Sequence, residues 1–122
     1  MKSLRLGVLG SGKGSNFVAL AEAIGEGQVP AGIVLVASDL TEAPILQLAR
    51  QRKLPVFACR PSAYRTKLEP EIEKELAQAL SQAGADLIVL AGYMRVLKEP
   101  LLHAFPGRIL NLHPSLLPSF PG

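Results

Sequence analysis

The residues Leu4–Ile24, LRLGVLGSGKGSNFVALAEAI, decide the fold. The apolar run Leu4–Leu9 predicts a short buried strand, and three glycines follow it within residues 10–14. Apolar residues then recur at the i, i+3, i+4 and i+7 spacing of an amphipathic helix, namely Phe17, Leu20, Ala21 and Ile24. A strand, a glycine-rich turn and a helix in direct succession indicate an α/β domain.

The rest of the chain repeats this alternation. Further strands are predicted at residues 32–38, 54–58, 86–92 and 108–113, and further helices from Pro44, from Glu69 and over residues 98–104. We expect Ser15 or Asn16 to cap the first helix and Gly25 and Gly27 to end it. Acidic residues at the start of the third helix suit its dipole: Glu69, Glu71 and Glu73. The pattern predicts one α/β domain over residues 1–122, a Rossmann-like three-layer sandwich with a mostly parallel sheet.

Composition narrows the class of protein. Hydrophobic residues make up 48% of the 122 residues and aromatic residues 5%, which predicts an aliphatic core. No apolar run approaches the roughly 18 residues of a membrane span, and no signal peptide precedes the first strand, so we expect a cytoplasmic protein without a membrane partner. The single cysteine, Cys59, excludes an internal disulfide and a thiolate zinc cluster, and no metal site is predicted. A net charge of +3 without a basic block argues against nucleic acid and slightly favours small anions.

The glycine loop only approaches two known nucleotide-binding motifs. Gly10 and Gly12 begin the dinucleotide fingerprint, but Ser15 takes the place of its third glycine. Gly12 and Lys13 match a P-loop, but Gly14 replaces the hydroxyl residue that would hold magnesium. Backbone N–H groups at a helix N-terminus still suit a phosphate, which we favour over a tight turn without a ligand. The predicted phosphate-binding residues are Gly12, Lys13, Gly14, Ser15 and Asn16.

A second group of polar residues lies in RILNLHPS, residues 108–115. Asn111 and His113 alternate with Leu112, so both are expected on one face of the fifth strand. The core residues predicted for this strand are Ile109, Leu110 and Leu112. The glycine loop and AGYMR, residues 91–95, also follow strands, so all three segments should meet at the ligand-binding edge of the sheet.

Asparagine and histidine together suit chemistry at a carbonyl group. An amide N–H can stabilise a developing oxyanion, and an imidazole can move the proton that an attacking amine must lose. Direct transfer between two bound substrates is favoured because no serine or cysteine is obviously placed as a nucleophile. His103 lies in a predicted helix without such neighbours, and we interpret it as structural.

At these residues the chain resembles the folate-dependent formyltransferases, most specifically the branch that formylates glycinamide ribonucleotide, from Leu4 to Gly122. The most specific motif is NLHPSLLPSFPG, residues 111–122. SGKGSN resembles the loop that takes the ribonucleotide phosphate, and LAGYMRVL resembles a folate-pocket segment. Methionyl-tRNA formyltransferases and folate deformylases share the Asn and His, but the tRNA enzymes typically have Arg-Gly where this chain has Pro121-Gly122.

The resemblance implies transfer of a formyl group from 10-formyltetrahydrofolate to the amine of glycinamide ribonucleotide, in purine biosynthesis. Asn111 would hold the formyl oxygen and His113 would be the general acid and base. The residues that would line the folate site are Arg65, Met94, Arg95, Val96, Leu97 and Asn111, with residues 94–97 acting mostly through backbone and apolar contacts. The partners implied are these two small molecules, with the protein a monomer or a homodimer.

One family feature is absent from residues 1–122. The aspartate that pairs with the histidine would follow Gly122, so we expect the C-terminal part of the fold to be missing and this segment alone to be nearly inactive. Two alternatives stay open: an NAD(P)-binding oxidoreductase domain in which Asp39 contacts a ribose, and a nucleotide-binding module without catalysis.

Overall fold

Strands and helices alternate along the whole described chain, as the sequence predicts. The computed structural model describes residues 3–112. The strands are β1 (Leu4–Leu9), β2 (Ala31–Ser38), β3 (Val56–Ala58), β4 (Leu87–Leu90) and β5 (Ile109–Asn111). The helices are α1 (Ser15–Gly25), α2 (Pro44–Gln51), α3 (Pro70–Gln82) and α4 (Glu99–Ala104). None of the helices within this range is long and apolar enough to cross a membrane.

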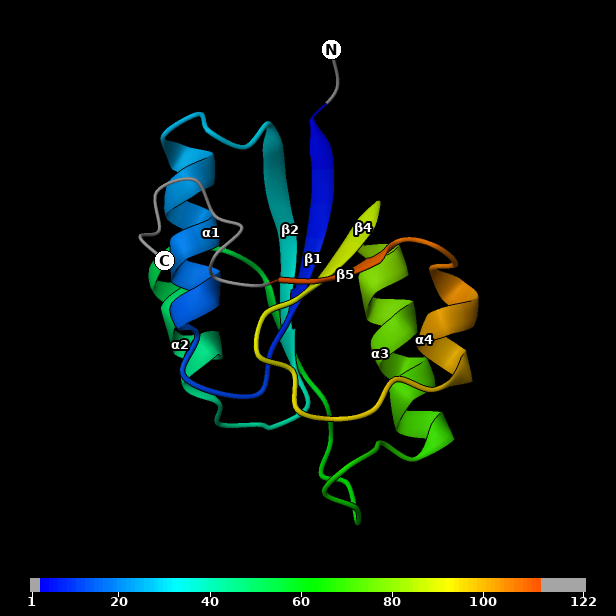
Figure 1. The fold of residues 1–122 in the computed structure, drawn as a ribbon. Coiled ribbons are helices and arrows are strands. Elements are labelled where there is room, and N and C mark those ends of the chain that lie inside the picture. The colour runs from blue at the N-terminus through cyan, green and yellow to red at the C-terminus, as the bar shows by residue number, and fades with distance from the viewer. Residues whose placement is uncertain (1–2, 113–122) are drawn as a thin grey trace.

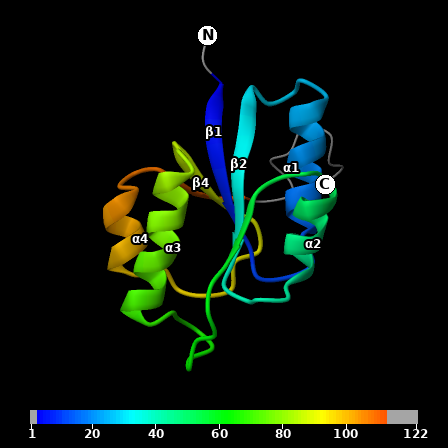
Figure 2. The same ribbon diagram turned by 180° about the vertical axis from the view of Figure 1, so that it is seen from behind.

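All strand pairs are parallel, and the sheet has the order β3-β2-β1-β4-β5. Strands β2 and β3 follow β1 on one side of it. The chain then returns past β1, and β4 and β5 are added on its other side. Helices α1 and α2 cover one face of the sheet, while α3 and α4 cover the other (Figures 1 and 2). This is the doubly wound, three-layer α/β sandwich expected from the sequence. Its strand order reverses between β1 and β4, which is where open sheets of this kind bind ligands.

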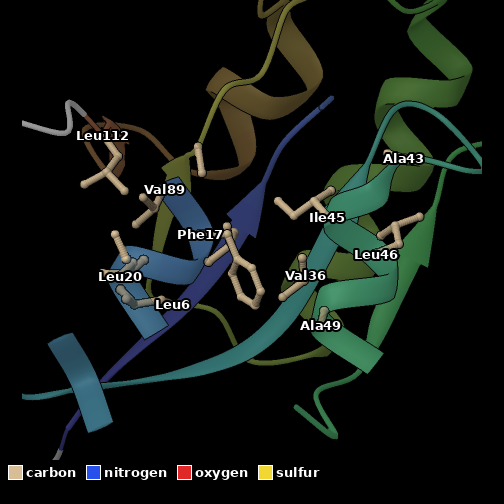
Figure 3. Close-up of a cluster of buried hydrophobic side chains, with 13 residues drawn as sticks. Leu6, Phe17, Leu20, Val36, Ala43, Ile45, Leu46, Ala49, Val89 and Leu112 are labelled. Carbon is tan, nitrogen blue, oxygen red and sulfur yellow. The ribbon is translucent and has the colours of Figure 1, made fainter. Parts of the chain in front are cut away.

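Alternation along the central strands divides the core into two clusters. In β1, Val8 faces α1 and α2, whereas Leu9 faces α3 and α4. Figure 3 shows the first cluster, in which the Phe17 ring lies among aliphatic side chains that include Val36 and Ile45. The second cluster contains leucines and isoleucines of the other face: Leu68, Ile72, Leu76, Leu80, Ile88 and Leu101. The core is mainly aliphatic, as the composition predicts.

The N-terminus of α1 differs from the prediction. Gly14 is the N-cap, with φ of 85°, and no side chain caps this helix, so the expected caps Ser15 and Asn16 lie inside its first turn. A positive φ favours glycine, and a Cβ atom at Gly14 would lie 3.1 Å from the Cα atom of Ile45. At the other end the prediction is confirmed, because α1 ends at Gly25 and Gly27 adopts φ of 80°.

The fifth strand is shorter and more exposed than predicted. It spans Ile109–Asn111 and pairs only with β4 among the described strands. Ile109 packs against the α3–α4 cluster and Leu112 is buried, as expected, but Leu110 is 47% exposed. The prediction of Leu110 as a core residue is therefore wrong, and the physical reason is position: β5 is the last strand of the described sheet and has a neighbour on one side only.

A buried carboxylate joins α3 to α4. Glu73 is fully buried in α3, and its Oε2 atom accepts hydrogen bonds of 3.0 Å from the backbone N–H groups of Lys98 and Leu101. Lys98 is the N-cap of α4 and makes no side-chain cap of its own. Glu73 therefore caps α4 from the neighbouring helix, a role that the sequence analysis did not predict.

Replacing Glu73 should destabilise the protein much more than replacing Glu71, its exposed neighbour in the first turn of α3. Glu73→Ala leaves the buried N–H group of Leu101 and the partly buried N–H group of Lys98 without this acceptor, and should lower the free energy of unfolding by about 2–4 kcal/mol. Glu73→Gln, which keeps one oxygen acceptor, should cost about half as much, and Glu71→Gln less than about 0.5 kcal/mol. Urea denaturation measures all three, and equal losses at both positions would contradict the capping role.

Close backbone contact fixes the start of the glycine loop. A Cβ atom at Gly10 would lie 2.6 Å from the carbonyl oxygen of Ala91 and 2.7 Å from Cδ1 of Ile45. The backbone N–H of Gly10 also donates to the carbonyl oxygen of Ala37, at 3.0 Å. No atom lies within 4 Å of the corresponding position at Gly12. Position 10 therefore has no room for a side chain, while position 12 is open.

We expect Gly10→Ala to lower the free energy of unfolding by about 1–3 kcal/mol, because the clashing carbonyl of Ala91 is backbone, and the N–H of the same residue is bonded to Leu9 of β1. Gly12→Ala is the matched control, with an expected change below about 1 kcal/mol. Thermal and urea denaturation of the two variants would compare them. A Gly12→Ala loss as large as that of Gly10→Ala would show that steric contact is not the cause.

Candidate functional site

The carboxyl ends of β1, β4 and β5 bring the predicted site segments to one edge of the sheet. Leu9 pairs with Leu90, and Leu90 pairs with Asn111, so the three residues form a row across neighbouring strands. Two strand spacings separate Leu9 and Asn111 by roughly 10 Å. The glycine loop begins directly after this row at Gly10. The prediction that the three segments share one edge is confirmed for the described residues.

The two connections that leave this row run in opposite directions. The chain turns from β1 toward α1 on one side of the sheet, and from β4 toward α4 on the other (Figure 1). Ser11 holds them together at their start: its backbone N–H donates to the carbonyl oxygen of Gly92 at 3.2 Å, and its Oγ accepts from the N–H of Met94 at 2.9 Å. Ser11 is buried. Sequence analysis missed this residue because its partner Met94 lies 83 residues further along the chain.

The glycine loop presents backbone N–H groups beside the N-terminus of α1. Within residues 3–112, no backbone or side-chain acceptor takes a hydrogen bond from the N–H groups of Gly12, Lys13 or Gly14. The carbonyl oxygen of Gly12 points the other way and accepts from the N–H of Ile45 at 3.1 Å. Lys13 is exposed. These N–H groups, which have no acceptor among the described residues, lie beside the N-terminus of α1 and an exposed lysine. Together they form an electropositive surface that suits a small anion.

The segment after β4 carries exposed apolar side chains next to this loop. Met94 is 77% exposed and Val96 57%, whereas Leu97 packs against the α3–α4 cluster. Large apolar side chains that stay this exposed at a ligand-binding edge are suited to the face of an aromatic or heterocyclic ligand. Their neighbour Arg95 behaves differently, because its side chain turns inward and is only 7% exposed.

Arg95 forms a buried ion pair with Asp39. Its Nε atom lies 2.5 Å from Oδ2 of Asp39, which is 3% exposed and lies directly after β2. Its Nη1 atom donates to the carbonyl oxygens of Tyr64 and of Lys67, the latter at 2.9 Å. Because Asp39 is enclosed in this pair, its carboxylate does not reach the surface to contact a ribose, as the oxidoreductase alternative requires.

Two further ionisable groups are buried around this ion pair. Burial and, second to it, the negative charge of Asp39 raise the pKa of the Cys59 thiol to about 12. The same two causes raise the pKa of the Tyr93 hydroxyl above its usual value. Cys59 is therefore a neutral thiol at physiological pH, in agreement with its predicted role as a small buried hydrophobe.

The remaining predicted site residues are placed as follows. Asn111 is exposed at the end of β5, in the row that starts the two loops, whereas the sequence analysis expects this strand to be a core strand. His113 lies outside the described residues. Arg65 is exposed on the loop before α3. His103 is exposed on α4, away from the strand ends, where the sequence analysis assigns it no chemistry.

A separate groove of about 1080 Å³ lies between α3 and α4. Tyr64, Lys74, Lys98 and His103 are among its lining residues. It is a surface feature of the helix layer and does not include the glycine loop or Asn111. We therefore place the candidate site at the strand ends, where the free N–H groups and the reversal of strand order coincide. Within residues 3–112 no group of three His, Cys, Asp or Glu side chains could hold a metal ion.

Comparison with known proteins identifies the family. The model of the formyl transferase family matches residues 4–122. The phosphoribosylglycinamide formyltransferase of Bacillus subtilis (strain 168) is 38% identical over 118 residues, which cover 97% of this chain and 60% of that protein. The protein of the same name from Haemophilus influenzae is 36% identical and is covered over 55% of its length. The chain thus spans little more than half of these relatives.

Solved structures agree with the sequence relatives. Glycinamide ribonucleotide transformylase 1 from Symbiobacterium toebii is 43% identical, with a TM-score of 0.82 over 98% of this chain and 56% of that one. Its counterpart from Geobacillus kaustophilus is 40% identical, with a TM-score of 0.81 over 99% of this chain and 63% of that one. The doubly wound sheet, the glycine loop at its edge and the match over residues 4–122 place this chain in the formyl transferase family.

Proposed function

We propose that this chain is the substrate-phosphate and catalytic portion of an enzyme that transfers a formyl group from 10-formyltetrahydrofolate to the amine of glycinamide ribonucleotide. The observation that carries the proposal is the pairing of two unlike binding surfaces by Ser11. An electropositive loop and an exposed apolar segment start side by side at the same sheet edge, joined by the 2.9 Å hydrogen bond between Ser11 and Met94. One surface suits a sugar phosphate, and the other suits a flat heterocycle.

The glycine loop is suited to one phosphate group. A monophosphate requires neither the third glycine of the dinucleotide fingerprint nor the magnesium-binding hydroxyl of a P-loop, and this loop has neither. The N–H groups of residues 12–14 and the N-terminus of α1 would hold the phosphate, with Lys13, Ser15 and Asn16 adding side-chain donors. The amine of the same substrate would then extend toward Asn111.

The segment Met94–Leu97 would bind the folate. Met94 and Val96 offer apolar contact area, and Arg65, exposed on the loop before α3, would meet a carboxylate of the ligand. The names of the relatives support formyl transfer to the glycinamide ribonucleotide, since both the B. subtilis and the H. influenzae proteins are named phosphoribosylglycinamide formyltransferase.

We propose that the formyl group is transferred directly between the two bound substrates. The substrate amine attacks the formyl carbon, and the carbonyl oxygen becomes negative. The amide N–H of Asn111 would donate to that oxygen. His113 would accept the proton that the amine loses and return it to the departing folate nitrogen as the C–N bond breaks, which leaves formylated substrate and tetrahydrofolate.

We further infer that residues 1–122 belong to one α/β domain and that the protein is cytoplasmic and a monomer or a homodimer. Its proposed partners are the two small molecules, with neither nucleic acid nor a membrane among them.

The proposal is tested by formyl transfer in the complete protein, followed by the absorbance change of the folate. Asn111→Ala should lower kcat/KM by about 10²–10³, because one oxyanion donor is lost. His113→Ala should lower it by about 10²–10⁴. His103→Ala is the matched control, because this exposed histidine on α4 lies away from the strand ends, and its rate should stay unchanged.

Unchanged transfer in both the Asn111→Ala and His113→Ala variants would rule out the assigned mechanism. Ligand titration separates the remaining alternatives. Binding of a ribose 5-phosphate amine supports the transferase, whereas specific binding of NAD in its place supports the oxidoreductase domain. Binding of the ribonucleotide without any formyl transfer would indicate a non-catalytic module.

A further inference from the structure

The loop before α3 and the segment after β4 are joined by hydrogen bonds to three backbone carbonyl groups of that loop. Arg95 donates to the carbonyl oxygens of Tyr64 and Lys67. The backbone N–H of Val96 donates to the carbonyl oxygen of Thr66, at 2.7 Å. Arg65 lies between these anchor points with its own side chain exposed. The backbone on both sides of Arg65 is therefore tied to residues 95 and 96, in part through the side chain of Arg95.

Asp39 supplies the charge that keeps this arginine inside. Its Oδ2 atom meets Nε of Arg95, which leaves the Nη1 atom directed at the loop carbonyls. Arginine is suited to this task because its planar guanidinium presents several donors in fixed directions. A lysine could keep the charge opposite Asp39, but one ammonium group could not reproduce the same spread of directions.

Stability alone does not explain this buried pair. The other carboxylate oxygen of Asp39, Oδ1, and the hydroxyl group of Tyr93 are both buried and have no hydrogen-bond partner among the described residues. A buried ion pair with incomplete hydrogen bonding is weak evidence for net stabilisation, because desolvation of the charges offsets their attraction. The main contribution of this ion pair is to fix the loop before α3 and the segment after β4 relative to each other.

We propose that Arg95 is a positioning residue for the folate site, held by Asp39, and that it does not contact the ligand through its side chain. It fixes loop 64–67, with Arg65, against residues 94–97, so that the two sides of the site are aligned before the ligand binds. This inference rests on the proposed function and assigns a task to two side chains within it. Asp39 acts only through Arg95.

The test uses Arg95→Lys in the complete protein, with Arg60→Lys as the matched control. Arg60 pairs with Glu75 on the surface near the same connection, so its replacement should change nothing measured. Arg95→Lys should raise KM for 10-formyltetrahydrofolate about tenfold, because an aligned site is lost, while KM for glycinamide ribonucleotide stays within about twofold. Amide exchange at Val96 should accelerate about tenfold, because loop 64–67 opens.

A double-variant comparison tests the role of Asp39. Asp39→Asn should raise KM for the folate, and adding it to Arg95→Gln should produce no further rise beyond Arg95→Gln alone. Equal increases in both KM values, or an unchanged KM for the folate, would overturn the proposal. If the unmodified protein transfers no formyl group, the proposed function fails, and the assignment to a folate site fails with it. Amide exchange at Val96 then still decides whether Arg95 holds the two loops.

Discussion

The parallel pairing of β1 with β4 is the constraint on which the rest of this structure depends. β1 lies at the centre of the sheet, with β2 on one side and β4 on the other. The strand order reverses between β1 and β4, so the connections that follow them leave toward opposite faces (Figure 1). The N–H of Ala91 donates to the carbonyl oxygen of Leu9 at 2.8 Å. The hydrogen bonds between β1 and β4 therefore continue up to the point where the two loops begin. Two loops of different chemistry can therefore start from one point.

The sequence predicts most of the fold because each element carries its own local signal. The apolar strands, the helix stripe from Phe17 and the proline at the start of α2 act within short windows, and the structure has an element at each. Strand order has no such signal, since it depends on which side of β1 the fourth strand joins. The prediction that Leu110 is a core residue was wrong for the same reason. Its apolar side chain is typical of a core strand, but its burial depends on the place of β5 at the end of the described sheet.

The candidate site divides in a similar way. The glycine loop and Asn111 could be found from the sequence, because closely spaced glycines and a polar residue within an apolar strand are visible in the sequence itself. The roles of Glu73 and Arg95 could not, because their partners lie 25 to 56 residues away in the chain. A charged side chain on a helix or loop normally faces water, and burial of these two depends on backbone groups that only tertiary structure brings near. Glu73 holds the start of α4 against α3, and Arg95 holds the loop before α3 against the segment after β4. Neither residue is part of the hydrophobic core.

The contrast between Gly10 and Gly12 limits how the glycine loop of this chain can vary. The carbonyl group of Ala91, directly after β4, leaves no room for a side chain at position 10, whereas position 12 faces open space. A side chain can therefore be added at position 12 without displacing the strand ends, whereas at position 10 it cannot. The outer part of the loop is thus free to change in shape while the strands that position it stay the same.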